Sequence, residues 1–179
     1  MRKEIRISGF GGQGIVLAGY VVGRAFTLYE NLEAVMTQSY GPEARGGASS
    51  ANVVVSDRSI AYPFVERPDI LITLSQEAYT RFQPLAKEEA LILIDQDLVK
   101  PEDNDQVYSI PATKMAEELG RRIVANMIML GFFTAVTEIV KRESMENALE
   151  ASVKAKTLPL NLKAFESGYI YAVNKERAR

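Results

Sequence analysis

Gly9-Phe10-Gly11-Gly12-Gln13-Gly14 follows a short apolar segment, Ile5 to Ser8, and opens a helical pattern of apolar residues that runs to about Tyr29. Glycine at the first, third and sixth positions permits a sharp turn and lets backbone N–H groups approach a ligand closely. A helix that begins at such a turn favours a negative group, because its first N–H groups lack intrahelical acceptors. The pattern therefore predicts a strand, an anion-binding turn and a helix, which is the start of an α/β sheet.

A dinucleotide site would also need an acidic residue at the end of the second strand, to bind a ribose hydroxyl. We expect that strand over Glu33 to Gln38, and Thr37-Gln38-Ser39 closes it without a carboxylate. Glu30 and Glu33 stand before the strand or at its start. The sequence thus argues against an NAD-type enzyme acting alone, although that alternative stays open. A second alternative is a turn that serves packing only and binds nothing. A third is a pure assembly module whose loops contact only protein.

A second glycine-rich loop follows the second strand, with the sequence Tyr40-Gly41-Pro42-Glu43-Ala44-Arg45-Gly46-Gly47. Ligands of doubly wound sheets bind beyond the carboxyl ends of strands, so we expect both loops to flank one cleft. Arg45 is suited to bidentate binding of a phosphate or carboxylate. Glu43 could pair with Arg45 or face a partner subunit. The alternative is a solvated turn with an incidental ion pair.

The rest of the chain alternates short apolar strands with helices as far as Pro111 and is helical after it. Further strands are expected at 49–56, 69–74, 90–95 and 107–110, and 60–62 could return as the second arm of a hairpin with 49–56. Helices are expected at 77–86, 113–119, 123–141 and 160–179, with another that has its N-cap at Ser144. The predicted fold class is α/β, with a three-layer, mostly parallel Rossmann-like sheet, an antiparallel hairpin and a helical C-terminal third. We expect one domain over residues 1–179.

Composition excludes several kinds of chemistry. The 179 residues carry a net charge of -2 and include no Cys and no His. Without Cys the chain cannot bind an iron–sulfur cluster through thiolates, and without either residue it has no ordinary zinc site. The charge balance argues against nucleic acid, and no window is apolar enough for a membrane span. No signal-peptide pattern opens the chain, so a cytoplasmic location is expected.

Other polar residues have more ordinary interpretations. Asp95 and Asp97 end a strand without a third ligand, and a loop or helix-cap role is favoured over a metal pair. Asn126 stands in an apolar helix, where it could reach the cleft or hold a loop carbonyl. Solvent exposure is expected for Lys3, Arg6, Arg121 and Arg122. The apolar helix from Ile123 and the C-terminal helix could form a partner surface, and a homodimer of the isolated chain is left open.

The two glycine loops together resemble the gamma subunit, also called domain III, of the 2-oxoacid:ferredoxin oxidoreductases. The resembling stretches are Gly9–Gly14, Ser39–Gly47, Pro68–Ile72, Gln76–Ala78, and Asn126-Met127 with Leu130-Gly131, within residues 4 to 135. Two such loops in order are far more specific than one glycine fingerprint. The amino-acid sequence of the second loop is most similar to that of the 2-oxoglutarate branch of the family, while the pyruvate and branched-chain oxoacid branches stay open.

The resemblance implies one subunit of an enzyme that is inactive alone. The complex would convert a 2-oxoacid and coenzyme A to acyl-CoA and CO₂ and would reduce ferredoxin. Thiamine diphosphate, Mg and the iron–sulfur clusters would lie on partner subunits, alpha, beta and, as an open point, delta. This chain would complete the cleft and the coenzyme A region without a catalytic residue or a metal. The contact residues implied are Gly9, Phe10, Gly11, Gly12, Gln13, Gly14, Tyr40, Gly41, Pro42, Glu43, Arg45, Gly46, Gly47 and Asn126.

Overall fold

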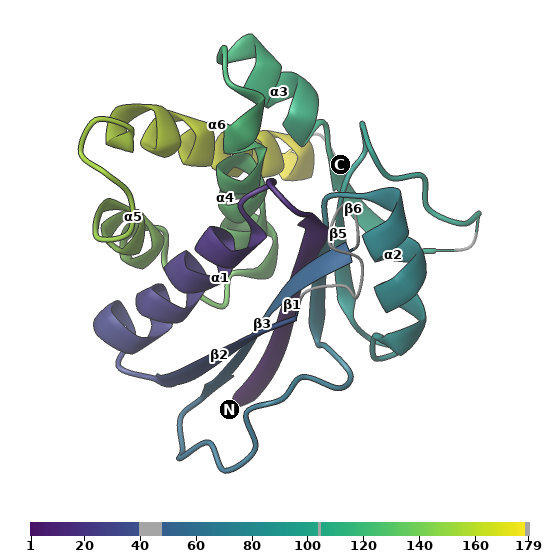
Figure 1. Cartoon of the computed structure of the whole chain (residues 1–179), viewed down its shortest axis with the longest axis vertical. Helices are drawn as coiled ribbons and strands as arrows, with labels where there is room; N and C mark the ends of the chain where they lie inside the picture. The colour runs from purple at the N-terminus through teal and green to yellow at the C-terminus, as the bar shows by residue number, and fades with distance from the viewer. Residues whose placement is uncertain (40–47, 104, 178–179) are drawn as a thin grey trace.

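The computed structural model describes residues 1–39, 48–103 and 105–177. Over these residues the strands form one six-stranded sheet with the order β2-β3-β1-β4-β5-β6 (Figure 1). The strands are β1 (Arg2–Phe10), β2 (Glu33–Ser39), β3 (Ala48–Ser56), β4 (Ile70–Thr73), β5 (Leu91–Asp95) and β6 (Val107–Ile110). β1, β4, β5 and β6 run parallel, and β3 is antiparallel to both of its neighbours, β1 and β2. The predicted α/β class, with a mostly parallel sheet, is confirmed.

The antiparallel hairpin is present, but its second arm was predicted wrongly. β3 pairs with β2 on one side and β1 on the other, and residues 60–62 form no strand. All nine residues of β3 are buried, because helices lie against both faces of the sheet at this strand. The chain leaves β3 at the edge where β1 begins, and it crosses that edge to start β4 parallel to β1.

Helices cover both faces of the sheet, as a mostly parallel sheet requires (Figure 1). One face carries the helix over Gln76–Phe82, and the helices of the C-terminal third join the helix over Ile15–Arg24 on the other face. The α-helices are α1 (Ile15–Arg24), α2 (Gln76–Phe82), α3 (Ala112–Glu118), α4 (Ala125–Thr137), α5 (Arg142–Glu150) and α6 (Leu158–Arg177). Shorter turns are η1 (Ala25–Tyr29), a π-helical end to α1, and the 3₁₀ turns η2 (Gln83–Leu85) and η3 (Arg122–Val124).

Two helix boundaries differ from the sequence prediction. The helix expected over 123–141 ends as α4 at Thr137, because Glu138 adopts a left-handed conformation with φ 50°. α5 begins at Arg142 with Lys141 as its N-cap, so the N-cap predicted at Ser144 is wrong. The Ser144 hydroxyl instead donates to the Glu30 carboxylate at 2.6 Å, and that carboxylate also accepts from the Lys141 N–H at 3.0 Å. A distant side chain therefore caps α5.

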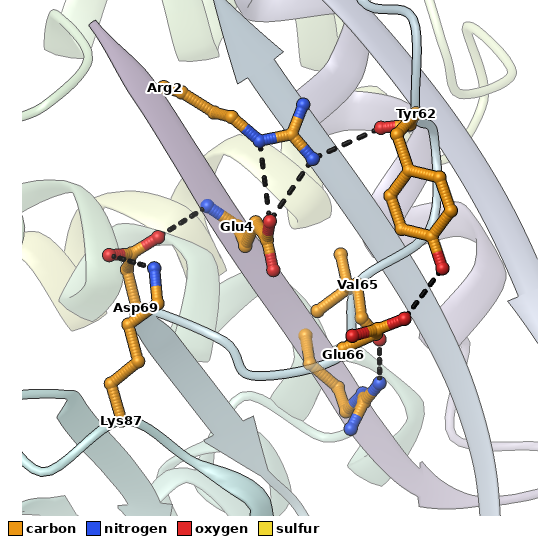
Figure 2. Close-up of polar contacts among 8 residues, drawn as sticks. Arg2, Glu4, Tyr62, Val65, Glu66, Asp69 and Lys87 are labelled. Carbon is orange, nitrogen blue, oxygen red and sulfur yellow. Dashed lines mark hydrogen bonds and ion pairs between the residues drawn. The ribbon is translucent and has the colours of Figure 1, made fainter.

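Near the start of β1, residues 57–69 cross from β3 to β4, and polar contacts hold this segment to the sheet (Figure 2). The Glu4 N–H donates to the Asp69 carboxylate at 2.8 Å, and Asp69 also pairs with Lys87. Arg2 donates to the Tyr62 carbonyl at 3.0 Å and forms an ion pair with Glu4. The crossing segment is therefore attached at several points along its length.

Arg6 reinforces the same attachment from inside the protein. Its Nε donates to Asn52 Oδ1 at 2.7 Å and its Nη2 to the Val65 carbonyl at 2.5 Å, while its guanidinium lies 4.8 Å from the centre of the Phe82 ring. The side chain is only 7% exposed, so the expectation of a solvated Arg6 is wrong. Successive side chains of β1 point to opposite faces of the sheet. Helices cover both faces, so a side chain on either face can be shielded from water. This burial, followed by the nearby Arg81, lowers the pKa of Arg6.

Among the helices described, none combines the length and the apolar character that crossing a bilayer requires.

Candidate functional site

The first glycine stretch forms the turn between β1 and α1, as predicted. Gly14 is the N-cap of α1 and has φ 72°, a left-handed conformation that side chains disfavour. A Cβ on Gly14 would lie 2.3 Å from Asn126 Nδ2. Gly12 also has a positive φ, of 92°. The backbone path of the turn therefore requires these two glycines whether or not a ligand binds.

Gln13 holds the turn to the sheet from within. Its Oε1 accepts from the Phe10 N–H at 2.6 Å, and its Nε2 donates to the Leu74 carbonyl at 2.8 Å. A Cβ on Gly9 would lie 2.4 Å from the same Oε1, so Gly9 makes room for this clamp. Contact between Gln13 and a ligand stays a prediction, and both ends of its amide already have intrachain partners.

Asn126, the polar residue of α4 that was singled out in the sequence, reaches the turn. Its Nδ2 donates to the Gly14 carbonyl at 3.1 Å, and its Oδ1 accepts from the Met127 N–H at 2.8 Å. The side chain is only 4% exposed. One of its two predicted roles, holding a loop carbonyl, is confirmed, and this bond fixes α4 against the start of α1.

Other parts of the turn face outward. Phe10 is 40% exposed although it is a large apolar side chain. Gly11 has no positive φ, and a Cβ added to it would meet nothing within 4 Å. Nothing within the described part of the chain thus explains why position 11 is a glycine. An approach from outside to the backbone at Gly11 would explain it.

The turn borders a hollow of about 950 Å³, within the size range of small-molecule sites. The hollow lies between the turn, the loop before α4, and the turn that joins α5 to α6. Its described lining is Phe10, Gly11, Gly12, Gly14, Ile15, Val16, Leu17, Ser49, Arg121, Ile123, Val124, Asn126, Ser152, Val153, Lys154, Lys156, Thr157, Leu160 and Asn161. The first turn of α1 belongs to this lining, contains no acidic residue, and receives no side-chain cap from the described residues. Its N–H groups are therefore available to an anion.

The described lining of the hollow contains three cations, Arg121, Lys154 and Lys156, and no carboxylate. None of these three forms an ion pair with another described residue. Arg121 is exposed, as the sequence predicted, and it also borders the hollow. Lys154 and Lys156 were not predicted as site residues. The sequence shows only that two lysines stand in the short connection between the last two helices, and this position does not indicate which part of the molecule they face.

The second glycine loop lies outside the described residues. This covers the predicted contacts Tyr40, Gly41, Pro42, Glu43, Arg45, Gly46 and Gly47, so the predicted meeting of both loops over one cleft stays a prediction. The residues on either side are described: Ala48 pairs with Phe10, and Ser39 pairs with Ser50. Both flanking residues stand at the sheet edge that carries the first turn.

Asp95 and Asp97 cap a helix, as the sequence favoured. The Asp95 carboxylate accepts from the Thr113 N–H at 3.1 Å and from the Thr113 hydroxyl at 2.6 Å, and Asp97 accepts from the Lys114 N–H at 2.7 Å. Burial raises the pKa of Asp95, and the hydrogen bonds from Thr113 partly offset that effect. The two carboxylates therefore fix the start of α3.

The family model for pyruvate ferredoxin/flavodoxin oxidoreductase matches residues 4–171, which is nearly the whole chain. The chain belongs to this family. Subunit KorC of 2-oxoglutarate synthase from Methanocaldococcus jannaschii is 55% identical over 174 residues, covering 94% of this chain and 93% of that subunit. The KorC subunit from Methanothermobacter marburgensis is 48% identical over 177 residues, covering 94% and 95%. The resemblance read from the two loops is thereby confirmed.

A solved member of the family has the same fold along its length. The gamma subunit of a keto/oxoacid ferredoxin oxidoreductase from Geobacter sulfurreducens PCA superimposes with a TM-score of 0.87 at 39% identity. The match covers 97% of this chain and 98% of that one. The likeness therefore includes the C-terminal helices, for which the sequence offered little family signal.

Proposed function

We propose that the chain is the gamma subunit of a 2-oxoacid:ferredoxin oxidoreductase that acts on 2-oxoglutarate. The complex would convert 2-oxoglutarate and coenzyme A to succinyl-CoA and CO₂ and pass two electrons to ferredoxin. The observation that carries the proposal is 55% identity to a 2-oxoglutarate synthase subunit over almost the full length of both chains. The chain would be one part of the enzyme and inactive alone.

The residues of this chain limit what it contributes. With no Cys it offers no thiolate to an iron–sulfur cluster, and no group of three or more potential ligands gathers among the described residues. We propose that thiamine diphosphate, Mg and the clusters are held by alpha and beta subunits, with a delta subunit left open. The chain would occupy the cytoplasm and form a single domain over residues 1–179.

Within the complex, this chain would form the coenzyme A region of the cleft. The exposed backbone at Gly11, the free N–H groups at the start of α1 and the cation-lined hollow fit a ligand that carries phosphate groups. When bound, coenzyme A supplies the thiol that accepts the acyl group. Gly9 to Gly14 and Asn126 would shape the near side of its site, and Tyr40 to Gly47 are proposed as further contacts.

The topology weighs against an NAD-type enzyme acting alone. β3 lies between β1 and β2, so the strand that follows α1 is not the neighbour of β1. Its end is Ser39 and no carboxylate. The ribose contact of a dinucleotide fingerprint requires a second strand that neighbours β1 and an acidic residue at the end of that strand, and this protein has neither.

Co-purification followed by an acyl-CoA assay tests the proposal. The tagged chain is expressed with its native genomic neighbours, and the complex is assayed with 2-oxoglutarate, pyruvate and 2-oxoisovalerate, following acyl-CoA and ferredoxin reduction. We expect thiamine-containing subunits to co-purify, kcat/KM to be highest with 2-oxoglutarate, and the chain alone to be inactive. Recovery of no thiamine-binding partner, or no acyl-CoA from any oxoacid, would overturn the proposal. Preference for another oxoacid would overturn only the substrate.

A further inference from the structure

The two outermost strands of the sheet, β2 and β6, are protected to different degrees (Figure 1). β6 has four residues, and α6 reaches its free side, because Lys175 Nζ donates to the Ser109 carbonyl at 3.1 Å. β2 has seven residues, and its backbone forms hydrogen bonds with β3 alone among the described residues. Every second residue of an outermost strand directs its N–H and C=O away from the sheet. β2 therefore offers a row of backbone donors and acceptors to a further strand.

β2 also lacks the features that commonly keep an outermost strand from pairing. Such strands are often very short or carry lysine or proline. β2 contains no proline, and its one charged residue is Glu33, whose carboxylate already accepts from the Ile60 N–H at 3.0 Å. The apolar side chains Val35 and Met36 are only half-buried. A further strand would pair the backbone of β2 and cover these side chains.

The sequence of β2 is compatible with a second copy of itself. Two antiparallel copies pair all seven residues when Met36 lies opposite its own equivalent. Val35 then lies opposite Thr37 of the second copy, and this pair occurs twice across the two-fold axis. Glu33 lies opposite Ser39, so no like charges meet. Pairs of β-branched residues stabilise antiparallel strands and opposed like charges destabilise them, so this register is favourable.

The helix beside β2 is placed so that a second copy fits as well. α1 lies over both β2 and β3, since a Cβ on Gly19 would lie 2.7 Å from Ala51 Cβ and 3.0 Å from Met36 Cε. Two sheets joined through β2 would have their β2 strands about 5 Å apart and their β3 strands about 14 Å apart, and hence their α1 axes about 10 Å apart. Packed helices lie about 8–10 Å apart. The two-fold axis keeps both copies of α1 on the same face of the joined sheet.

One side of α1 is open to such a neighbour. Tyr20 is 56% exposed. Three residues further along the same side of the helix, a Cβ on Gly23 would meet no atom of the described residues within 4 Å. A second α1 beside the first would have this open side available to pack against.

We infer that β2 pairs with β2 of a second copy of this chain, antiparallel and centred on Met36, to form a two-fold symmetric dimer with one continuous sheet. The same strand and helix serve both copies, as a two-fold interface requires. The inference does not depend on the proposed function, because it concerns a contact between copies of the chain alone.

The test measures self-association of the purified chain by sedimentation velocity over a range of micromolar concentrations. The like-charge variant, Val35→Lys with Thr37→Lys, places lysine opposite lysine at two points of the proposed register. The matched control, Val35→Lys with Thr37→Glu, places lysine opposite glutamate at the same two points. Both variants lose the same valine and threonine, and circular dichroism during thermal unfolding verifies that each is folded.

We expect the wild-type chain to form a dimer at the higher concentrations. The like-charge variant should have a dimer Kd about tenfold above that of the control, because two cross-strand pairs change from opposite to like charge. Amide hydrogen exchange of wild-type residues 33–39 should slow as the concentration rises, whereas residues 107–110 of β6 should keep their rates. This exchange measurement needs no variant, so it decides even where a variant does not fold.

A wild-type chain that stays monomeric, or exchange of residues 33–39 that does not change with concentration, would overturn the inference. A like-charge variant that dimerises as tightly as its control would place the contact elsewhere and also overturn it. Loss of the dimer in both folded variants would overturn the proposed register. Protection of residues 33–39 only in a complex with other subunits would assign β2 to a strand of a partner subunit and refute the pairing of two copies.

Discussion

Gln13 determines how the glycine turn is attached to the sheet. One end of its amide holds the turn at Phe10, and the other end holds the carbonyl of Leu74, directly after β4. The sequence singled this residue out as a polar side chain in a glycine turn, which suggested contact with something outside the chain. The bonds that it makes are internal, so its effect on any ligand would come through the position of the turn.

Replacing Gln13 with alanine is expected to destabilise the protein by about 1–2 kcal/mol, because the Phe10 N–H and the Leu74 carbonyl each lose a partner. Urea denaturation of the isolated chain measures this. Gln96→Ala is the matched control, since Gln96 is exposed and its side chain makes no hydrogen bond to a described residue, and it should change stability by less than about 0.5 kcal/mol. Equal effects of the two substitutions would show that the clamp adds no stability.

At this scale the sequence predicted what local backbone chemistry requires and missed what tertiary packing brings together. Gly14 and Asn126 were both selected, the first from its place in the turn and the second as a polar residue in an apolar helix. Lys154 and Lys156 could not be selected, because they border the hollow only when the start of α6 lies beside the glycine turn in the folded protein. Arg6 was misjudged, since alternation along a strand does not reveal which faces are covered.

Two helices of the C-terminal third, α4 and α6, meet through glycines. A Cβ on Gly131 would lie 1.9 Å from the Phe165 carbonyl oxygen, and one on Gly168 would lie 1.9 Å from the Ile128 carbonyl oxygen. Both obstacles are backbone atoms, which cannot move aside as a flexible side chain could. The two helix axes are therefore held at a distance that only glycine permits.

Gly131→Ala is expected to cost about 3 kcal/mol or more of the free energy of unfolding, because α4 and α6 must separate to admit the methyl group. Gly23→Ala in α1 supplies the control, since no atom of the described residues lies within 4 Å of the Cβ that it would gain. Alanine there should stabilise the protein by about 0.5–1 kcal/mol through helix propensity. Thermal and urea unfolding of both variants measure the difference. A Gly131→Ala protein as stable as wild type would contradict the close contact.

Most of the strands and helices could be predicted, because a sheet covered on both faces leaves continuous apolar runs such as residues 70–72 of β4. The pairing of β3 could not be predicted. Its run of valines fits either an edge arm or a strand between two others, and the pattern of side chains does not distinguish them. The start of α5 was missed for a similar reason, since Glu30, its capping partner, is more than a hundred residues away in sequence.

The whole molecule has two unlike sheet edges. At the edge where β1 begins, the crossing segment 57–69 is attached through Glu4, Arg2 and the buried Arg6. At the opposite edge the glycine turn and the hollow face outward. Polar contacts thus close one end of the protein, and the features proposed to bind a ligand lie at the other.

Arg6→Met should loosen the closed edge without disturbing the other. The variant loses both hydrogen bonds of the guanidinium, so amide hydrogen exchange across residues 57–69 should quicken about tenfold while residues 10–17 keep their rates. Exchange is the appropriate measurement, because replacing a buried charge with an apolar side chain can leave the free energy of unfolding unchanged. Arg58→Met, at an exposed arginine of the same segment, should leave exchange as in wild type. Unchanged exchange in Arg6→Met would show that the other contacts suffice.

The position of β3 has a consequence for the direction in which a bound molecule extends. Neighbouring strands lie about 4.8 Å apart, so a strand inserted between β1 and β2 moves the end of β2 to about 10 Å from β1. A molecule anchored at Gly11 would have to bridge that wider span to lie along the sheet, whereas the hollow beside it leads toward the start of α6. The helices of the C-terminal third, which the sequence suggested as a partner surface, would then limit how long a molecule the hollow can accommodate.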